Sequence, residues 1–330
     1  MPKFITPTEI TVGGAVDGYR DTDVSAQLGG DAGSVAGIFL LVINKSGGDL
    51  YWGARKKGST DDFAYELTAG GQTTVGIGVD GDDVVQLYSA DLTNIDFYLL
   101  GYVLDTEGEF FTNAVDVRAG SAGTWLEKDI SGDTGANTAT YVFGIVRNIN
   151  ANNYAYGVRG SGESHVRYGR CRGYNLAGWS CQCSGSEKIE VYVNNTVEDH
   201  YVTGYLFDNY TSVTEAEVSP TKDATYRLVD LSGDGVPSNA VGIDYHIHDG
   251  VGSDDLTFSS HIRAAADETD FYYKVATHQH GVVRVSSQSV DVKMEASGDN
   301  IYLRGYFTEP AAGTPPGQLV TTKYNDIEAS

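Results

Sequence analysis

The sequence is poor in basic residues, has few cysteines and contains no long apolar run. Of its 330 residues, 22 are Lys or Arg and 45 are Asp or Glu, so the formal net charge is −23 at pH 7. This charge argues against nucleic acid and anionic membrane surfaces as partners, because both would repel the chain. No stretch approaches the roughly 18 consecutive apolar residues that a membrane-spanning helix needs. We therefore expect neither nucleic-acid binding nor membrane insertion.

Other absences concern chemistry and location. The segment 1–10 lacks a basic stretch followed by a long apolar one, so we expect no secretory signal peptide. The motifs G-x-S-x-G and H-E-x-x-H and the P-loop are missing. Paired carboxylates are so frequent in this acidic chain that no single pair is informative. The sequence therefore predicts a protein that is not an enzyme.

The residues that are abundant point to β-structure. The chain has 41 Gly, 22 Tyr and 11 Phe, and an aromatic, Gly-rich composition suits strands and tight turns. No segment shows a sustained 3.6-residue period, so helices should be rare. Asp outnumbers Glu by 30 to 15, which fits either turn-rich structure or a halophilic origin.

The pattern Y-x-x-G-Y occurs three times. Its last two residues are Gly101 and Tyr102, Gly204 and Tyr205, and Gly305 and Tyr306. The glycines are 103 and 101 residues apart. A fixed period of about 100 residues, each able to bury its own core, indicates tandem domains rather than a solenoid.

A second marker precedes each copy of the first. Arg55, Arg159 and Arg263 are 104 residues apart both times, and a strand-like run precedes each arginine. We expect these arginines to have a structural role, pairing with an Asp or with backbone carbonyls inside each repeat. The alternative is a repeated ligand contact.

Each repeat holds six to eight short β-rich runs separated by Gly, Asp, Asn and Ser. This spacing predicts an all-β chain of three tandem β-sandwich modules, either jelly-roll or immunoglobulin-like. We expect an N-terminal arm over 1–15, modules over 16–105, 106–208 and 209–307, and an extended C-terminal tail over 308–330.

Two H-x-H pairs provide candidate metal ligands. They are His246 with His248 and His278 with His280. Residues two apart on a strand point to one face, and imidazole pairs hold transition metals. The sequence does not establish whether the two strands are neighbours. The alternative is a set of solvent-facing or interface histidines.

Asp-rich turns are candidates for a weak structural Ca²⁺ site. The segment 230–235 resembles the start of an EF-hand loop, but position twelve is Val241 where Glu is required. The EF-hand interpretation therefore fails. The carboxylates of the turn at 80–83 could bind Ca²⁺ weakly, or they could serve only to stabilise the turn. We expect no cofactor other than such a structural metal ion.

The three cysteines are Cys171, Cys181 and Cys183. Because the other parts of the chain have none, a disulfide framework is excluded. The segment 171–183 looks like a hairpin, in which Cys171 lies opposite Cys181 or Cys183. That arrangement would allow one cross-hairpin disulfide in an oxidising medium. A zinc site there would need a fourth ligand, and His165 is the nearest candidate.

Aromatic clusters at 51–52 and 154–156 could stack on sugar rings or form a protein interface. The repeat pattern as a whole, with a strand-like run, G-x-R-x-x-G-S and Y-x-x-G-Y, resembles tandem β-sandwich repeats in virion structural proteins of tailed viruses. These proteins include capsid decoration, head-fibre, turret and tail components. The third repeat departs from the pattern, with His261 and the segment 264–266 in place of the Gly and the Gly-Ser continuation.

The resemblance implies a virion structural protein at the capsid surface, with the major capsid protein or other virion proteins as partners. We expect a homo-oligomer, either a trimer or a pentamer, placed on the virion surface after synthesis in the host cytoplasm. The N-terminal arm or first module would dock on the particle, and the third module would lie outermost. The alternative function is a tail-fibre adhesin that binds a host surface glycan or receptor.

Overall fold

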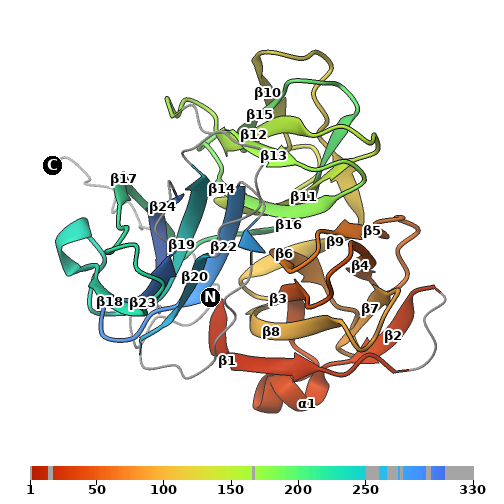
Figure 1. The fold of residues 1–330 in the computed structure, drawn as a ribbon, viewed down its shortest axis with the longest axis horizontal. Helices are drawn as coiled ribbons and strands as arrows, with labels where there is room; N and C mark the ends of the chain where they lie inside the picture. The colour runs from red at the N-terminus through yellow and green to blue at the C-terminus, as the bar shows by residue number, and fades with distance from the viewer. Residues whose placement is uncertain are drawn as a thin grey trace, which may run out of the picture.

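A computed structural model of the protein describes residues 2–13, 18–165, 168–249, 260–265, 274–275, 278–294 and 299–308 (Figure 1). It contains 24 strands, one α-helix at Ser25–Leu28 and two 3₁₀ turns at Gly29–Asp31 and Ser232–Asp234. The prediction of an all-β fold with few helices is confirmed.

The strands fall into three sets of eight, here called units 1, 2 and 3. Unit 1 contains β1 (Lys3–Ile10), β2 (Arg20–Asp23), β3 (Val35–Asn44), β4 (Leu50–Lys56), β5 (Tyr65–Leu67), β6 (Gly71–Gly78), β7 (Val84–Ser89) and β8 (Ile95–Leu104). Unit 2 contains β9 (Gly108–Asp116), β10 (Trp125–Asp129), β11 (Tyr141–Asn148), β12 (Tyr154–Gly160), β13 (Gly169–Cys171), β14 (Leu176–Gln182), β15 (Lys188–Val193) and β16 (Glu198–Leu206). Unit 3 contains β17 (Tyr210–Glu217), β18 (Arg227–Asp230), β19 (Ala240–Asp249), β20 (Ser260–Ala264), β21 (Lys274–Val275), β22 (His278–Arg284), β23 (Ser289–Met294) and β24 (Asp299–Thr308).

Units 1 and 2 have the same topology. Counted from the start of each unit, strands 1, 8, 3 and 6 form one antiparallel sheet and strands 2, 7, 4 and 5 form the other. An immunoglobulin-like sandwich would instead place its first two strands side by side in one sheet. Eight strands that alternate between two sheets in this way form a jelly roll, so the structure selects one of the two predicted arrangements.

Unit 3 repeats this order with one exception. Its sheets are β17-β24-β19-β22 and β18-β23-β20. The described part of β21 does not pair with β20. It pairs in parallel with β6 of unit 1, with Lys274 opposite Gly71 and Val275 opposite Gln72.

The predicted N-terminal arm contains β1, which pairs with β8 in the first sheet. Strands β9 and β17 have the same place in units 2 and 3, paired with β16 and β24. Each unit therefore begins with a strand that closes its sheet, and in unit 1 that strand starts at Lys3. Residues 309–330 of the predicted tail lie outside the described residues.

Each unit has its own apolar core between its two sheets. On β7 the buried and partly exposed positions alternate, and Val85 and Leu87 are fully buried. The same alternation on β15 buries Ile189, Val191 and Val193. This period of two is that of a strand with one face in a core. Strand β6, by contrast, is buried at every position.

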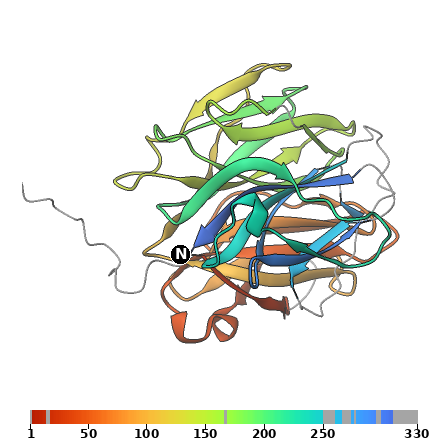
Figure 2. The same ribbon diagram turned by 90° about the vertical axis from the view of Figure 1, so that its left-hand side faces the viewer.

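Strand β6 is buried on both faces because the sheets of strands 1, 8, 3 and 6 face one another. Strands β6, β14 and β22, one from each unit, contact each other. A further apolar cluster combines side chains from all three units, among them Phe39, Phe143 and Phe307. Figures 1 and 2 show the three units grouped around this shared centre. We call the sheet that faces the centre the inner sheet of its unit.

Candidate functional site

The three inner sheets meet through equivalent strands in cyclic order. Phe110, on the first strand of unit 2, lies over Gly37 on the third strand of unit 1, where an added Cβ would come within 2.3 Å of the ring. Phe4, on the first strand of unit 1, lies in the same way over Gly242 of unit 3, where a Cβ would come within 2.2 Å of the ring. At the junction between units 2 and 3 the large residue is on the other strand, because Tyr141 of unit 2 takes the position of the glycine.

A bulge in the eighth strand of each unit gives a second cyclic contact. The register of the eighth strand against the third shifts at this bulge in every unit. The bulged residues are Leu100, Thr203 and Arg304. Thr203 donates a hydrogen bond from Oγ1 to the Gly76 carbonyl of unit 1 at 2.7 Å. Arg304 donates from Nη1 to the Ser180 carbonyl of unit 2 at 2.8 Å.

The third member of this set is apolar. Leu100 of unit 1 belongs to the same apolar cluster as Val282 on β22 of unit 3. Cross-strand pairing shows that Gly76, Ser180 and Val282 have equivalent positions on the sixth strands. Each unit therefore contacts the sixth strand of the preceding unit, and unit 1 contacts that of unit 3. Contacts that run head to tail and return to their start form a closed ring.

The bulged residue is the third residue of the Y-x-x-G-Y motif. The glycine directly after it is required by close backbone approach. A Cβ on Gly101 would lie 2.4 Å from the Lys3 carbonyl oxygen. A Cβ on Gly204 would lie 2.7 Å from the Glu109 carbonyl oxygen, and one on Gly305 would lie 2.6 Å from that of Thr211. No side chain fits against the first strand of the unit at these positions.

The tyrosine of the motif faces the core of its own unit. Tyr102 donates a hydrogen bond from its hydroxyl to Asp31 at 2.6 Å. Tyr205 donates to Glu109 at 2.8 Å or to the Thr134 carbonyl at 2.7 Å. Tyr306 packs against the core of unit 3. These residues hold loops and strands of one unit together.

The three repeated arginines have matching surroundings on the outer sheets. Arg55 donates to Gln86 at 2.8 Å and lies 3.9 Å from the Tyr19 ring centre. Arg159 donates to Glu190 at 2.6 Å and lies 4.1 Å from the Trp125 ring centre.

Arg263 completes the set. It lies 3.6 Å from Asp291 and 3.6 Å from the Tyr226 ring centre. Arg55 and Arg159 also donate to the carbonyl six residues ahead, that of Asp61 or His165. In each unit the guanidinium is thus already engaged by a neighbouring polar side chain and an aromatic ring.

A further repeated residue was not found from the sequence. Asn44 and Asn148 end the third strands of units 1 and 2, and both are fully buried. Asn44 donates to the Gly48 and Leu67 carbonyls, which joins two loops at one end of unit 1. Asn148 does the same with the carbonyls of Asn152 and Cys171. The two asparagines are 104 residues apart, the spacing of the arginines, and this would have revealed them.

One junction is polar where the others are apolar. Phe39, Phe143 and Asp244 have the same position on their third strands, opposite Gly101, Gly204 and Gly305. Asp244 is fully buried and lies 3.8 Å from Arg304. Tyr210 donates a hydrogen bond to it at 3.1 Å. Burial raises the pKa of Asp244 to about 6, although the Arg304 charge opposes this shift.

The predicted metal ligands lie beside this carboxylate. Strands β19 and β22 are paired, with His246 opposite His280 and His248 opposite His278. The rings of His246 and His280 stack with centroids 4.9 Å apart. Nδ1 of His280 lies 2.6 Å from Nη1 of Arg304, so this nitrogen faces a cation already.

The side chains of His248 and His278 lie outside the described residues. Where side chains are described, no group of three or more His, Cys, Asp or Glu is placed to hold a metal ion. The turn predicted as a Ca²⁺ site, 80–83, uses its carboxylates within the protein: Asp80 accepts from the Val84 amide and Asp83 from the Gly33 amide. Metal binding stays a prediction.

The hairpin prediction for the cysteines is wrong. Cys171 lies on β13 in the outer sheet, whereas Cys181 lies on β14 in the inner sheet. The four-residue loop between these strands crosses from one sheet to the other, so β13 and β14 do not pair with each other. All three thiols, including that of Cys183, are free and buried, and burial raises the pKa of each one.

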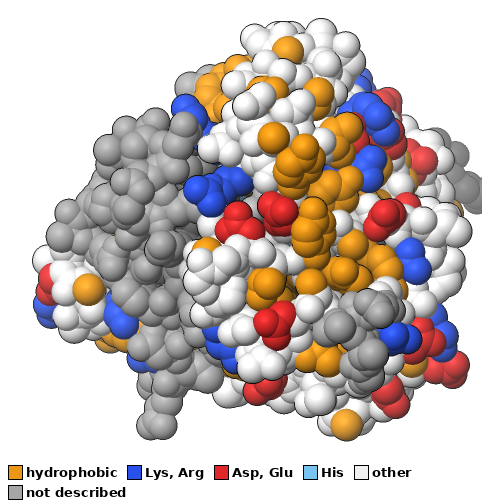
Figure 3. All heavy atoms as spheres, turned by 45° about the vertical axis from the view of Figure 1, so that its right-hand side comes forward, with side chains coloured by type: hydrophobic (Ala, Val, Ile, Leu, Met, Phe, Trp, Pro, Cys, Tyr) orange, Lys and Arg blue, Asp and Glu red, His pale blue; other side chains and the backbone are white. Residues whose placement is uncertain are grey.

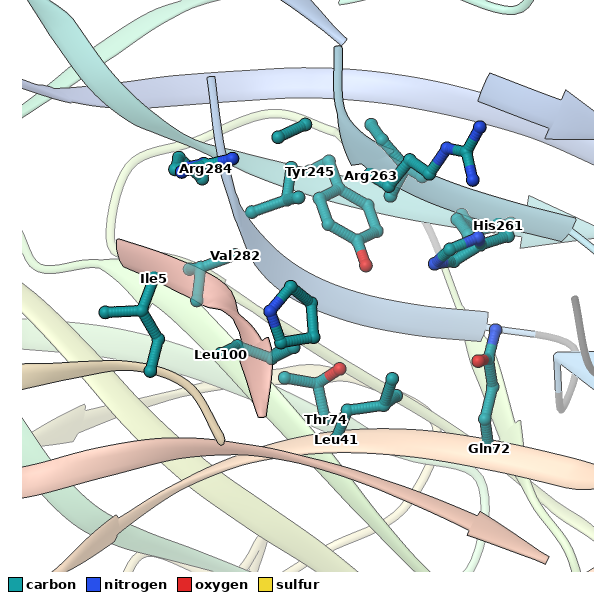
Figure 4. A pocket seen from close by; sticks show the side chains of 15 residues that line it. Ile5, Leu41, Gln72, Thr74, Leu100, Tyr245, His261, Arg263, Val282 and Arg284 are labelled. Atoms are coloured by element: carbon teal, nitrogen blue, oxygen red, sulfur yellow. The ribbon is translucent and has the colours of Figure 1, made fainter. Parts of the chain in front are cut away.

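The predicted aromatic clusters are mostly internal. Trp52 and Tyr156 are fully buried in the cores, whereas Tyr51 is 42% exposed. A small pocket lies between units 1 and 3. Figure 4 shows Tyr245 and Val282 of unit 3 on one side and Leu100 of unit 1 on the other. This pocket therefore belongs to the third junction of the ring.

Comparison with known proteins gives no family. No protein family and no curated protein matches the chain, so the resemblance to tailed-virus proteins has no support from sequence. A chain from Sulfolobus Turreted Icosahedral Virus is 8% identical, with 94% of this chain and 91% of that chain covered and a TM-score of 0.23. The CBM22-1–CBM22-2 tandem domain of Paenibacillus barcinonensis Xyn10C is 11% identical, with 84% and 100% covered and a TM-score of 0.19. Neither similarity bears on function at these scores. Among the described helices, none is long and apolar enough to cross a membrane.

Proposed function

We propose that the protein is a structural component of a virus particle surface. The observation that carries this proposal is the closed ring of three jelly rolls within one chain. Head-to-tail contacts and a shared apolar centre make the ring a single rigid block, as a particle component requires. Its net charge of −23 favours a solvated outer surface.

The ring bears on two of the expectations drawn from the sequence. The three units lie side by side around one centre, so a first unit on the particle with a third unit outermost is not the arrangement we propose. The inner sheets are covered within the chain. A trimer or pentamer of the protein would therefore have to form through outer sheets or loops.

The proposal is tested by quantitative mass spectrometry of purified particles of the virus that encodes the chain. We expect the protein at a fixed ratio to the major capsid protein, and we expect surface labelling of intact particles to reach it. Absence of the protein from particles would contradict the proposal.

A second candidate is glycan binding. Jelly rolls also occur in lectins, and Tyr51 and Tyr174 are 42% and 44% exposed. Exposed tyrosine rings can stack on the apolar faces of sugars. A glycan array probed with the purified chain separates the two candidates. Binding that is lost in a Tyr51→Ser and Tyr174→Ser variant would favour the second one.

A further inference from the structure

Units 1 and 2 carry a group of exposed large hydrophobic residues at their seam. Tyr51, Leu92, Ile149 and Tyr174 are 42%, 39%, 47% and 44% exposed. Among the residues whose burial is described, one other large hydrophobic residue is as exposed, Leu228 of unit 3 at 67%. Four of five such side chains therefore belong to two neighbouring units. We call these four residues the seam patch.

Backbone hydrogen bonds join the segments that carry the seam patch. The Ala90 amide, two residues before Leu92, donates to the Tyr51 carbonyl at 2.9 Å. Glu66 lies opposite Tyr51 on the neighbouring strand, and its amide donates to the Tyr174 carbonyl at 2.8 Å.

The Tyr174 amide then donates to the carbonyl of Asn150, next to Ile149, at 3.0 Å. The segments that carry the seam patch are thus joined across the boundary between units 1 and 2. Figure 3 shows a band of hydrophobic side chains on the face that includes the right-hand side of Figure 1, where β4 and β5 lie.

The loops around the seam patch are uncharged overall, while on strand β5 the Glu66 carboxylate lies against the Tyr51 hydroxyl within the patch. They are 45–49, 68–70 and 90–94 in unit 1 and 149–153, 172–175 and 194–197 in unit 2. Their charged residues are Lys45, Asp49, Asp91 and Arg172, two positive and two negative, so the net charge is zero.

The loops at the other ends of the same strands are strongly acidic. They are 24–34, 57–64, 79–83 and 105–107 in unit 1 and 130–140, 161–168, 183–187 and 207–209 in unit 2. They contain twelve acidic residues and two basic residues, Lys57 and Arg167, which gives a net charge of −10. Units 1 and 2 therefore have a strongly acidic end and an end whose loops carry no net charge.

We infer that the seam patch is the surface that docks on the protein shell of the particle. This inference rests on the proposed function. Apolar patches surrounded by polar groups mark protein interaction sites, and interface centres are depleted in charge and rich in Tyr. Docking through the neutral end keeps the acidic loops in solvent. The partner is accordingly a predominantly apolar protein surface that also accommodates the Glu66 carboxylate.

The test compares a patch variant with a matched control in assembled particles. The variant combines Tyr51→Ser, Ile149→Asp and Tyr174→Ser. The control is Leu228→Asp, which replaces the exposed hydrophobic residue outside the seam patch. Thermal melts of both purified chains establish that they fold. We expect the patch variant to be depleted from purified particles by about tenfold or more, because it removes central aromatic contacts, and the control to be incorporated like the wild type.

Equal incorporation of a folded patch variant would overturn the inference while leaving the proposed function intact. Absence of the wild type from particles would instead overturn the proposed function. Two other occupants of the seam patch would also overturn the inference. One is a second copy of the chain, shown by a dimer in analytical ultracentrifugation that the patch variant abolishes. The other is a glycan, shown by array binding that the same variant loses.

Discussion

The junction between units 1 and 2 and the junction between units 2 and 3 use the same positions with different chemistry. At the first, Thr203 donates a hydrogen bond to a backbone carbonyl beside stacked phenylalanines. At the second, Arg304 takes the place of Thr203, and Asp244 takes the place of Phe39 and Phe143. The same ring position thus holds apolar packing at the first junction and, at the second, an ion pair buried within unit 3 whose arginine also donates to a carbonyl of unit 2.

The difference between the junctions concerns the cost of losing one group. A buried ion pair contributes little net stability, but breaking it is costly, because one charge is left without its partner. Arg304 pairs with Asp244 of its own unit and donates across the junction to the Ser180 carbonyl of unit 2. The second junction should therefore be more sensitive than the first to the loss of a single side chain.

The largest effect is expected at the ion pair. Arg304→Leu leaves Asp244 buried without its cation, and we expect the free energy of unfolding to fall by about 3–5 kcal/mol. Calorimetry measures this loss. The control is Arg227→Leu, since the side chains of Arg227 and its partner Asp223 are 48% and 34% exposed and exposed pairs contribute about 1 kcal/mol or less. A loss of similar size in both variants would remove the distinction between the junctions.

A somewhat smaller effect is expected at the first junction. A Cβ on Gly178 would lie 1.8 Å from the Thr74 carbonyl oxygen of unit 1. Gly178→Ala should therefore force the two units apart and cost about 2–3 kcal/mol. Urea unfolding measures the change. Gly185→Ala is the matched control, because nothing lies within 4 Å of its added Cβ. A loss below that of the control variant would show that the units are not in close contact.

The pH dependence of stability should distinguish the junctions further. The pKa of Asp244 is raised from 3.8 to about 6 in the folded protein. The folded state therefore holds this proton between about pH 4 and 6, where the unfolded state has lost it. Folding is favoured below this window and becomes less favourable as pH rises through it.

An Asp244→Asn variant isolates this effect, because the other titrating groups, His280 among them, are common to both proteins. Relative to the variant, the wild type should lose about 2 kcal/mol of stability as pH rises from 4 to 7. Melting temperatures across this range check the difference. A constant difference between the two proteins would mean that Asp244 is not buried at a junction.

The smallest effect is expected at the equivalent bulge. Thr203→Val removes one hydrogen bond to the Gly76 carbonyl and should cost about 1 kcal/mol. Chemical unfolding at neutral pH measures it. If Thr203→Val cost as much as Arg304→Leu, the two junctions would be energetically alike and the comparison would fail.

The repeats could be predicted from the sequence because local backbone sterics select their residues. Gly101, Gly204 and Gly305 are glycines for the same reason, the carbonyl of a paired strand. The arginines have equivalent surroundings in each unit and therefore recur at equal spacing. Asn44 and Asn148 also have equivalent surroundings in their units, so their equal spacing could have been found in the sequence.

The strand topology and the ring could not be predicted from the repeats. Strand order depends on pairing between distant segments, so the sequence did not distinguish a jelly-roll from an immunoglobulin-like arrangement. The hairpin prediction for the cysteine segment was wrong because two strands joined by a short loop resemble a hairpin in the sequence, whereas the loop between β13 and β14 crosses between sheets. Asp244 was not aligned with Phe39, because a charged residue at a buried position hides the equivalence.

Closure of the three units into one ring is tested most directly by small-angle X-ray scattering of the full-length chain. A compact chain of 330 residues should have a radius of gyration of about 20 Å, whereas three separate units of about 13 Å in a row would give about 30 Å. The ring predicts the smaller value, unchanged on dilution. A value near the larger one would show that the units do not close on one another.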